Sequence, residues 1–508
     1  MTDGEKDDGV SKSVWRYAMA DRANVIIDVD GYFELMRDAM CNARQQIFLI
    51  GWDFDTRIHL SGGRRWWNLP RRSRYPARLG AFIVWLAKRT KTLDVRILKW
   101  NFAFFKFLFR GSMIIDLIRW WTKERIDFKF DSAHPVGCSH HQKIVVIDDR
   151  LAACGGIDMT SDRWDTRLHR DDDPRRRLPG GRRKYGPWHD ITMMMEGEVA
   201  SALGELGRRR WELAGGEPLD CCSEQIGSPW PKRLQAQFTN VEVGIARTRS
   251  AYLGNPQVAE IEELFVEQIG RARYFVYAET QYFASRRIAE AIQARLQEPE
   301  PPEFVIVHPQ NADGWLEQMA MDTARARILN SMLPSDHARR FHLYVPYTTR
   351  GAPIYVHAKF MIVDDRILRV GSANMNNRSM GLDSECDVFL DADRPANAHI
   401  EPTIRKIRYS LLAEHCGLSE AQVAAALDDG RSMAAMIDSL PKSGKHLARF
   451  VPKDISEFEG AIADGGFLDP ERPGEWMEPI GKRGLFRKGG KLRRPVMALK
   501  ELRRRLSE

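Results

Sequence analysis

The stretch HQKIVVID (residues 141–148) returns later in the chain as HAKFMIVD (residues 357–364). Both copies read His-x-Lys-x4-Asp, and both run into Asp-Asp-Arg and then, at the same offset, into a pair of small residues. One such motif is a weak signal, whereas two copies with matching flanks are a strong one. The chain is therefore expected to consist of two similar halves, each of which delivers one motif to a shared site.

Strand and helix patterns repeat in the same order around the two motifs. Apolar, β-branched runs typical of buried strands alternate with helical periodicity in both halves. After each motif a further strand begins with an acid, Asp190 in the first half and Glu385 in the second. Besides the motifs themselves, the expected strands cover residues 46–52, 94–98, 126–130, 151–155 and 190–194, and then 274–278, 304–307, 341–345, 367–370 and 385–390.

This order predicts an α/β protein built from two similar α/β sandwich domains. Mixed sheets flanked by helices, a pseudo-twofold axis between the domains and an active site at their interface are expected. The predicted division is a polar N-terminal segment (1–20), a first repeat (21–225), a second repeat (226–445) and a C-terminal extension with a basic tail (446–508). A charged insertion, residues 167–184, is present in the first half alone.

Composition narrows the class of partner. The 508 residues carry a net charge of +8, which favours an anionic partner such as phospholipid, nucleic acid or a phosphorylated small molecule. A mildly basic net charge is, however, common among proteins of this size. Seven cysteines without a C-x-x-C pair predict neither a disulfide framework nor structural zinc. The acidic start lacks an apolar signal region, and no run of 18 apolar residues exists. A cytoplasmic protein that can touch a membrane surface is expected.

The motifs suit the chemistry of a phosphate diester. Residues i and i+2 of a strand share a face, so His141 and Lys143 point the same way, as do His357 and Lys359. Two lysines can neutralise phosphate oxygens and hold the charge that develops in the transition state. One histidine can attack phosphorus while the other protonates the leaving oxygen and then activates water or an alcohol. No metal or other cofactor is expected.

Each histidine also needs its second ring nitrogen held by an acceptor. Asp190 and Glu385 occupy equivalent places in the repeats and are predicted to do this, with Asp190 holding His141. Asp148 and Asp364 complete the candidate catalytic set as members of the motifs. Their odd offset from the lysines turns them to the other strand face, so we expect them to secure structure and not to touch substrate.

The phosphate is expected to bind to Lys143 and Lys359, assisted by Asn374 and Ser372. The counterpart of Asn374 in the first half is Asp158, which cannot donate a hydrogen bond when ionised. The two halves are therefore not expected to be chemically equal. The role of His189, next to Asp190, stays open between lining the site and supporting the structure.

At these residues the chain resembles the phospholipase D superfamily, whose mark is the duplicated His-x-Lys-x4-Asp motif. The resemblance runs from about Val25 to about Leu412. Three segments are similar to the eukaryotic type: Arg163–Asp165, Pro187–Asp190 and Glu279–Phe283, the last departing from the family pattern at Thr280. The length leaves no room for the extra lipid-binding domains of animal and plant members, so the resemblance implies a compact, bacterial-style enzyme.

The resemblance implies a phospholipase D with His141 as nucleophile and His357 as acid and base. Such an enzyme converts glycerophospholipids such as phosphatidylcholine, through a phosphohistidine intermediate, into phosphatidic acid and a head-group alcohol. A primary alcohol in place of water gives a transphosphatidylated lipid. The implied partner is a phospholipid membrane surface or micelle, with no nucleic acid, and the protein is expected to be a monomer.

Two other classes of function stay open on the sequence alone. A cardiolipin or phosphatidylserine synthase, or another phosphodiesterase such as a nuclease, would use the same motifs, and the basic charge would suit a nuclease. A lipid-binding or partner-binding scaffold without activity is disfavoured because both motifs keep their histidine and lysine.

Overall fold

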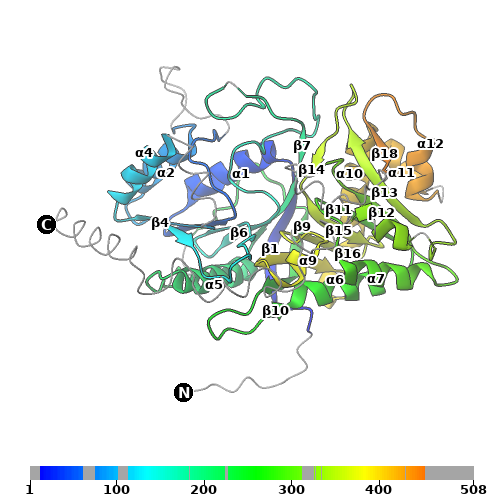
Figure 1. The fold of residues 1–508 in the computed structure, drawn as a ribbon. Helices are drawn as coiled ribbons and strands as arrows, with labels where there is room; N and C mark the ends of the chain where they lie inside the picture. The colour runs from blue at the N-terminus through cyan, green and yellow to red at the C-terminus, as the bar shows by residue number, and fades with distance from the viewer. Residues whose placement is uncertain are drawn as a thin grey trace.

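The computed structural model describes residues 12–60, 75–100, 112–181, 183–223, 227–311, 325–326, 328–332, 334–428 and 431–451. These residues form an α/β body around one mixed, 16-stranded sheet (Figure 1). The aromatic pair Trp66-Trp67, the segment 102–109 and most of the basic tail lie outside the described residues. Among the described residues, no helix is long and apolar enough to cross a membrane.

The sheet runs through both halves in the same order, counted outward from the seam between β1 and β9. The first half contributes β1-β8-β6-β5-β2-β3-β4, and the second contributes β9-β17-β16-β15-β11-β12-β13, with β18 added at the far edge. In each half the four strands next to the seam pair antiparallel and the three outer strands of the repeat pair parallel with one another, whereas the added strand β18 pairs antiparallel with β13. The predicted pseudo-twofold relation is therefore confirmed.

The bounds of the strands follow the apolar runs of the sequence. In the first half they are β1 (Arg16–Ile27), β2 (Gln46–Gly51), β3 (Asp94–Trp100), β4 (Ile126–Asp131), β5 (Ile144–Ile147), β6 (Leu151–Gly155) and β8 (Ile191–Glu196). In the second half they are β9 (Phe238–Arg249), β10 (Val258–Ala259), β11 (Phe275–Thr280), β12 (Glu303–Val307), β13 (Phe341–Tyr347), β15 (Lys359–Val363), β16 (Ile367–Gly371), β17 (Glu385–Asp391) and β18 (His446–Arg449). A separate two-stranded sheet pairs β7 (Trp188–His189) with β14 (Tyr355–Val356).

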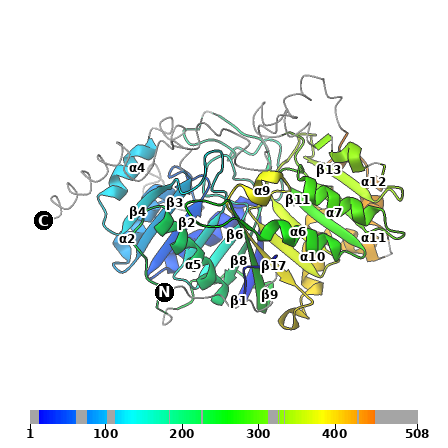
Figure 2. The same ribbon diagram turned by 60° about the horizontal axis from the view of Figure 1, so that its bottom comes forward.

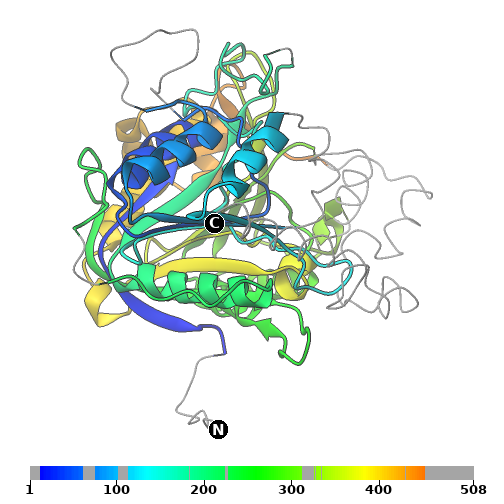
Figure 3. The same cartoon turned by 90° about the vertical axis from the view of Figure 1, so that its left-hand side faces the viewer.

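Helices cover both faces of the sheet, as Figure 3 shows from the side of the first half. The first half holds α1 (Val29–Asn42), α2 (Leu79–Arg89), α4 (Ser112–Trp121) and α5 (Glu198–Leu213). The second holds α6 (Glu260–Gly270), α7 (Arg286–Leu296), α9 (Asn377–Gly381), α10 (Glu401–Cys416), α11 (Glu420–Asp428) and α12 (Met433–Ser439).

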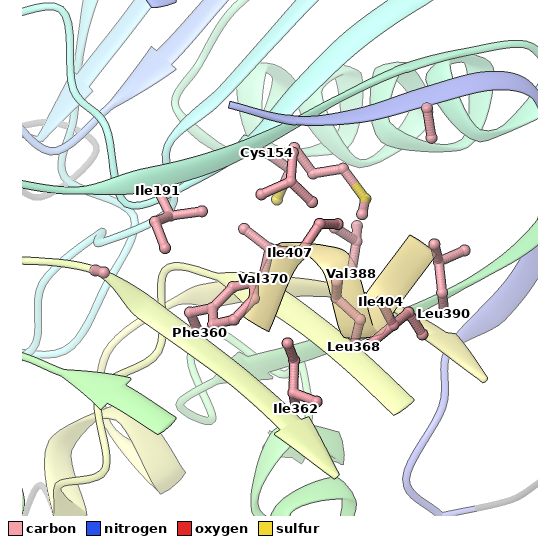
Figure 4. Close-up of a cluster of buried hydrophobic side chains, with 14 of the residues drawn as sticks. Cys154, Ile191, Phe360, Ile362, Leu368, Val370, Val388, Leu390, Ile404 and Ile407 are labelled. Atoms are coloured by element: carbon pink, nitrogen blue, oxygen red, sulfur yellow. The ribbon is translucent and has the colours of Figure 1, made fainter. Parts of the chain in front are cut away.

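Three apolar clusters form the core. One lies under α1, α2 and α4, and another under α6 and α7. The third takes in α5, α10 and strands of both halves, and Figure 4 shows Cys154 and Ile191 of the first half opposite Val370 and Val388 of the second. This shared core holds the two halves in one fixed arrangement, which is what a site built from both of them requires.

Two expectations differ from the structure. The polar segment 1–20 was expected to precede the ordered repeat, but Arg16–Ala20 already belongs to β1, which pairs with β8 on one side and β9 on the other. The long strand β9 was not expected at all. Charged residues interrupt both strands, yet each lies inside the sheet, so position in the sheet outweighs the local pattern. The domain boundaries stay a prediction.

Candidate active site

The two motif histidines stand where the two halves meet, and backbone pairing across the halves places them. The His141 N–H donates to the carbonyl of Ser384, 2.9 Å away, in the segment that leads into Glu385. The His357 N–H donates to the carbonyl of His189, 2.8 Å away, in the segment that leads into Asp190. The pairing of β7 with β14, between the halves in Figure 1, extends the second contact.

This crossed pairing decides which acid holds which histidine. The Nδ1 of His141 lies 3.0 and 3.1 Å from the two carboxylate oxygens of Glu385. The Nδ1 of His357 lies 2.7 Å from Asp190. Each histidine is thus held by the acid of the opposite half, and the prediction that Asp190 holds His141 is wrong. In each ring Nδ1 is used, which leaves Nε2 as the nitrogen that can react.

The two acids are supported differently. Glu385 accepts hydrogen bonds from the hydroxyls of Ser372 and Ser379. Asp190 accepts one from the N–H of Ile191, and Gly156, at the place of Ser372, leaves room for it: a Cβ there would come within 2.0 Å of the Asp190 carboxylate. The hydroxyl of Ser372, predicted to bind phosphate, therefore donates to the acid instead.

Burial sets the protonation of these groups. It raises the pKa of Glu385 to about 8 and that of Asp190 to about 6. Burial, together with the nearby lysine charges, holds the pKa of both motif histidines well below the usual range. Each histidine is therefore neutral near pH 7, so the one that attacks phosphorus has a free lone pair.

The lysines lie beside the histidines, as their spacing predicts. Lys143 donates to the carbonyl of His141 at 2.8 Å and lies 3.4 Å from Asp158. Lys359 donates to the carbonyl of His357 and to the side-chain oxygen of Gln281 at 3.0 Å. One lysine therefore faces a carboxylate and the other an amide, so the predicted inequality of the halves is seen in their contacts. Burial lowers the pKa of Lys359 to about 7.

Asn374 lies among these groups. It is 3% exposed, and its Oδ1 is buried without a hydrogen-bond partner among the described residues. Its N–H donates to Ser379, the serine that also supports Glu385. The unpartnered atom is an acceptor, so the phosphate contact predicted for the side-chain amide stays a prediction.

The two motif aspartates have structural contacts, as expected. Asp148 accepts hydrogen bonds from three consecutive backbone N–H groups, residues 44–46, at 2.7–2.8 Å. Asp364 does the same for residues 273–275 at 2.6–2.9 Å. Each carboxylate therefore joins its motif to the start of the neighbouring strand, at the end of the motif remote from the histidine.

Sequence reasoning did not single out an aromatic and cationic wall beside His357. The ring of Trp188 stacks on Tyr355 at 4.6 Å and lies 5.1 Å from His357. The guanidinium of Arg163, 8% exposed, lies 4.1 Å from the centre of the Trp188 ring. The signal was present in the segments Arg163–Asp165 and Pro187–Asp190, which carry the family resemblance but no recognisable chemistry on their own.

Behind the site lies a buried cluster of charged groups from both halves. Asp28, His169, His189 and Glu414 each offer a ligand atom, all within 4.8 Å of one another. The Nδ1 of His189 lies 3.1 Å from Asp28 and 3.2 Å from Glu414, and its Nε2 donates to Glu279 at 2.6 Å. His189 therefore supports the structure and does not line the site. These groups could hold a divalent cation, so metal analysis of the purified protein tests the predicted absence of a metal here.

Comparisons with known proteins point to phospholipases D as relatives of this chain. The family model named Phospholipase D matches residues 318–464. Phospholipase D alpha 1 of Zea mays is 26% identical over 398 residues, which cover 56% of this chain and 49% of that protein. Phospholipase D A of Dictyostelium discoideum is 24% identical over 429 residues, covering 72% of this chain and 32% of that protein. The chain spans about half the length, or less, of these curated relatives.

Among solved structures, phosphatidylserine synthase of Haemophilus influenzae Rd KW20 has a TM-score of 0.50 at 13% sequence identity, over 78% of this chain and 88% of that one. At that identity the likeness shows the fold alone. The duplicated motif, the family-model match and the curated relatives together support the phospholipase D superfamily for this chain.

Proposed function

We propose that the protein is a phospholipase D that cleaves glycerophospholipids such as phosphatidylcholine. The observation that carries this proposal is the crossed pairing: each motif histidine is held by a buried acid of the other half, 3.0 and 2.7 Å away, beside a motif lysine. Two oriented imidazoles and two buried lysines are what a phosphodiester needs when it is cleaved by in-line attack and protonation.

In the first step, His141 Nε2 attacks phosphorus and the bond to the head-group oxygen breaks. Exposure supports this assignment, because the side chain of His141 is 15% exposed and that of His357 is 6% exposed. Glu385 stabilises the positive charge that forms on the His141 ring. The intermediate is a phosphatidyl group on His141.

His357 gives a proton to the leaving oxygen and later takes one from water or an alcohol. Part of what lowers its pKa is the charge of Lys359 and Arg163. An anionic phosphate bound among these cations opposes that effect and raises the pKa of His357, so a proton becomes available once substrate is bound. Attack of water on phosphorus then breaks the bond to His141 and yields phosphatidic acid, and attack of a primary alcohol in the same way yields a phosphatidyl-alcohol.

The test is incubation with phosphatidylcholine and a primary alcohol. Phosphatidyl-alcohol and choline should form, and His141→Ala and His357→Ala should each lose both products. Acceptors such as glycerol or serine in parallel arms separate a hydrolase from a synthase-like phosphatidyltransferase. Activity that survives in either variant would refute the mechanism. If the protein cleaves DNA and does not turn over lipid, the proposed substrate is wrong, whereas the two-histidine mechanism still stands.

A further inference from the structure

Helix α4 turns an apolar face to solvent. Ile115, Ile118 and Trp121 are 52%, 57% and 38% exposed, and they follow one another at three-residue spacing along one side of the helix. Nine large apolar side chains are exposed among the described residues, and three of them fall within these seven positions. Scattered exposed apolar residues are ordinary, whereas a group on one helix face marks an interaction surface.

The opposite face of α4 is fixed, so the apolar face cannot turn inward. Met113 and Trp120 are buried in the core of the first half. The indole N–H of Trp120 donates to the carbonyl of Gly80 at 3.1 Å, and buried Asp116 pairs with Arg78 at 2.6 Å. The helix is thus held to α2 by both packing and polar contacts, with its apolar stripe pointing outward.

The surroundings of the stripe are basic. Residues 75–100 and 112–125 hold nine lysines and arginines against three acids, and one of the nine, Lys99, is buried and paired with Asp53. Two of these acids, Asp94 and Asp116, are already paired with arginines. Arg119, on α4 itself, has a side chain that is 65% exposed. An apolar stripe beside unbalanced positive charge is complementary to a surface of anionic lipid, which offers both acyl chains and negative head groups.

The stripe begins near the end of the sheet that carries the site and runs away from it toward the start of β4. Strand β3 ends at Trp100, which stacks on Trp52 at 5.9 Å, and Trp52 meets the ring of His141 edge-on at 6.4 Å. Because α4 connects the parallel strands β3 and β4, its first residues lie toward that same end of the sheet. Figure 2 shows α4 at the outer edge of the first half, in the upper part of the view like α9.

We infer that the face of α4 formed by Ile115, Ile118 and Trp121 docks on an anionic phospholipid surface. The inference rests on the proposed function, since it explains how a lipid-cleaving site meets its substrate in a bilayer. The isoleucines and tryptophan enter the interfacial region, while Arg119 and its basic neighbours meet lipid phosphates. The docked helix holds the mouth of the site beside the head groups.

The test uses the whole protein and vesicles of phosphatidylcholine with and without phosphatidylglycerol. Ile115→Ser/Ile118→Ser should weaken binding to the anionic vesicles by at least about tenfold in co-sedimentation. Arg119→Gln should weaken it a few-fold, and added salt should reduce this second effect. Leu253→Ser/Tyr274→Ser is the matched control, because these side chains are 75% and 73% exposed but lie elsewhere; its binding should equal that of the wild type.

A second measurement separates docking from catalysis. Turnover of a short-chain phosphatidylcholine dissolved as monomers should be unchanged in the α4 variant, while turnover of vesicles falls with binding. If no lipid is turned over, the proposed function fails, and the binding series still tests the surface. Equal vesicle binding by the α4 variant and the control would overturn the inference. Loss of a dimer in the α4 variant, seen by sedimentation velocity, would assign this face to a second copy of the chain and overturn it too.

Discussion

Asp148→Ala should destabilise the protein severely and leave the chemistry of the folded fraction intact. The Asp148 carboxylate is 3% exposed and accepts hydrogen bonds from the backbone of Arg44, Gln45 and Gln46 at 2.7, 2.7 and 2.8 Å. Alanine removes all three acceptors at once. No atom of this contact set belongs to the histidines, the lysines or the acids that hold the histidines.

The size of the loss follows from these contacts. Hydrogen bonds to a charged group contribute about 1.5–3 kcal/mol each, and the one from Gln46 is fully buried. The other two donors are partly buried, so water can replace the carboxylate at a cost of about 1 kcal/mol each. Asp148 also has a φ of 54°, a left-handed backbone conformation in which alanine costs about 1 kcal/mol more. The free energy of unfolding should fall by about 4–6 kcal/mol.

Urea titration followed by tryptophan fluorescence measures this change, with turnover scaled to the folded fraction. Asp148→Asn keeps one acceptor and a residue that tolerates positive φ, so it should lose about half as much. Asp364→Ala removes the same three bonds but from more exposed donors, and should also lose less. A stable Asp148→Ala protein with turnover reduced a hundredfold or so would place this carboxylate in the chemistry and refute the reasoning.

Three further outcomes are expected. Glu385→Gln keeps the shape of the acid but removes the ionisable group that can balance the positive His141 ring of the intermediate, so kcat on phosphatidylcholine should fall by about 10²–10⁴-fold, and a loss below about threefold would contradict the crossed pairing. Burial lowers the pKa of Lys359 to about 7, so its charge is lost as pH rises through that value and kcat/KM should fall there; Lys359→Arg should move this fall to higher pH, and a profile without it would speak against a charged phosphate clamp. Gly156→Ala places a Cβ 2.0 Å from the carboxylate of Asp190 and should lower both the melting temperature and kcat, whereas Gly227→Ala, with nothing within 4 Å, should change neither.

The repeat and the motif strands could be predicted because their signals are local. The runs Ile144–Ile147 and Lys359–Val363 are apolar, β-branched and flanked by turn residues, so pattern and structure agree. Strands β1 and β9 were missed for the opposite reason. Their charged residues hide an alternation that matters only when each strand is paired on both sides, and that pairing is set by tertiary structure.

Prediction of the site from the sequence meets the same limit as prediction of these strands. Residue types and spacing identify the histidines, lysines and acids, because the chemistry requires them. They do not say which acid holds which histidine, since His141 and Glu385 are 244 positions apart and meet only after both halves have folded. Likewise, Ser372 looks like a phosphate ligand by its place next to the motif, and only its distance to Glu385 reveals that it serves the acid.

The crossed pairing has a consequence for what one repeat can do alone. A separate repeat would carry a motif histidine without its acid and an acid without its histidine, so as a monomer it would lack the paired site however well it folded. Strands β1 and β9 meet antiparallel across the pseudo-twofold axis, which is also how a strand pairs with its own copy in a symmetric dimer. Two halves produced as separate chains could therefore complement each other along this seam, and activity would appear only on mixing. The proposed active site therefore belongs to the junction of the repeats and to neither repeat.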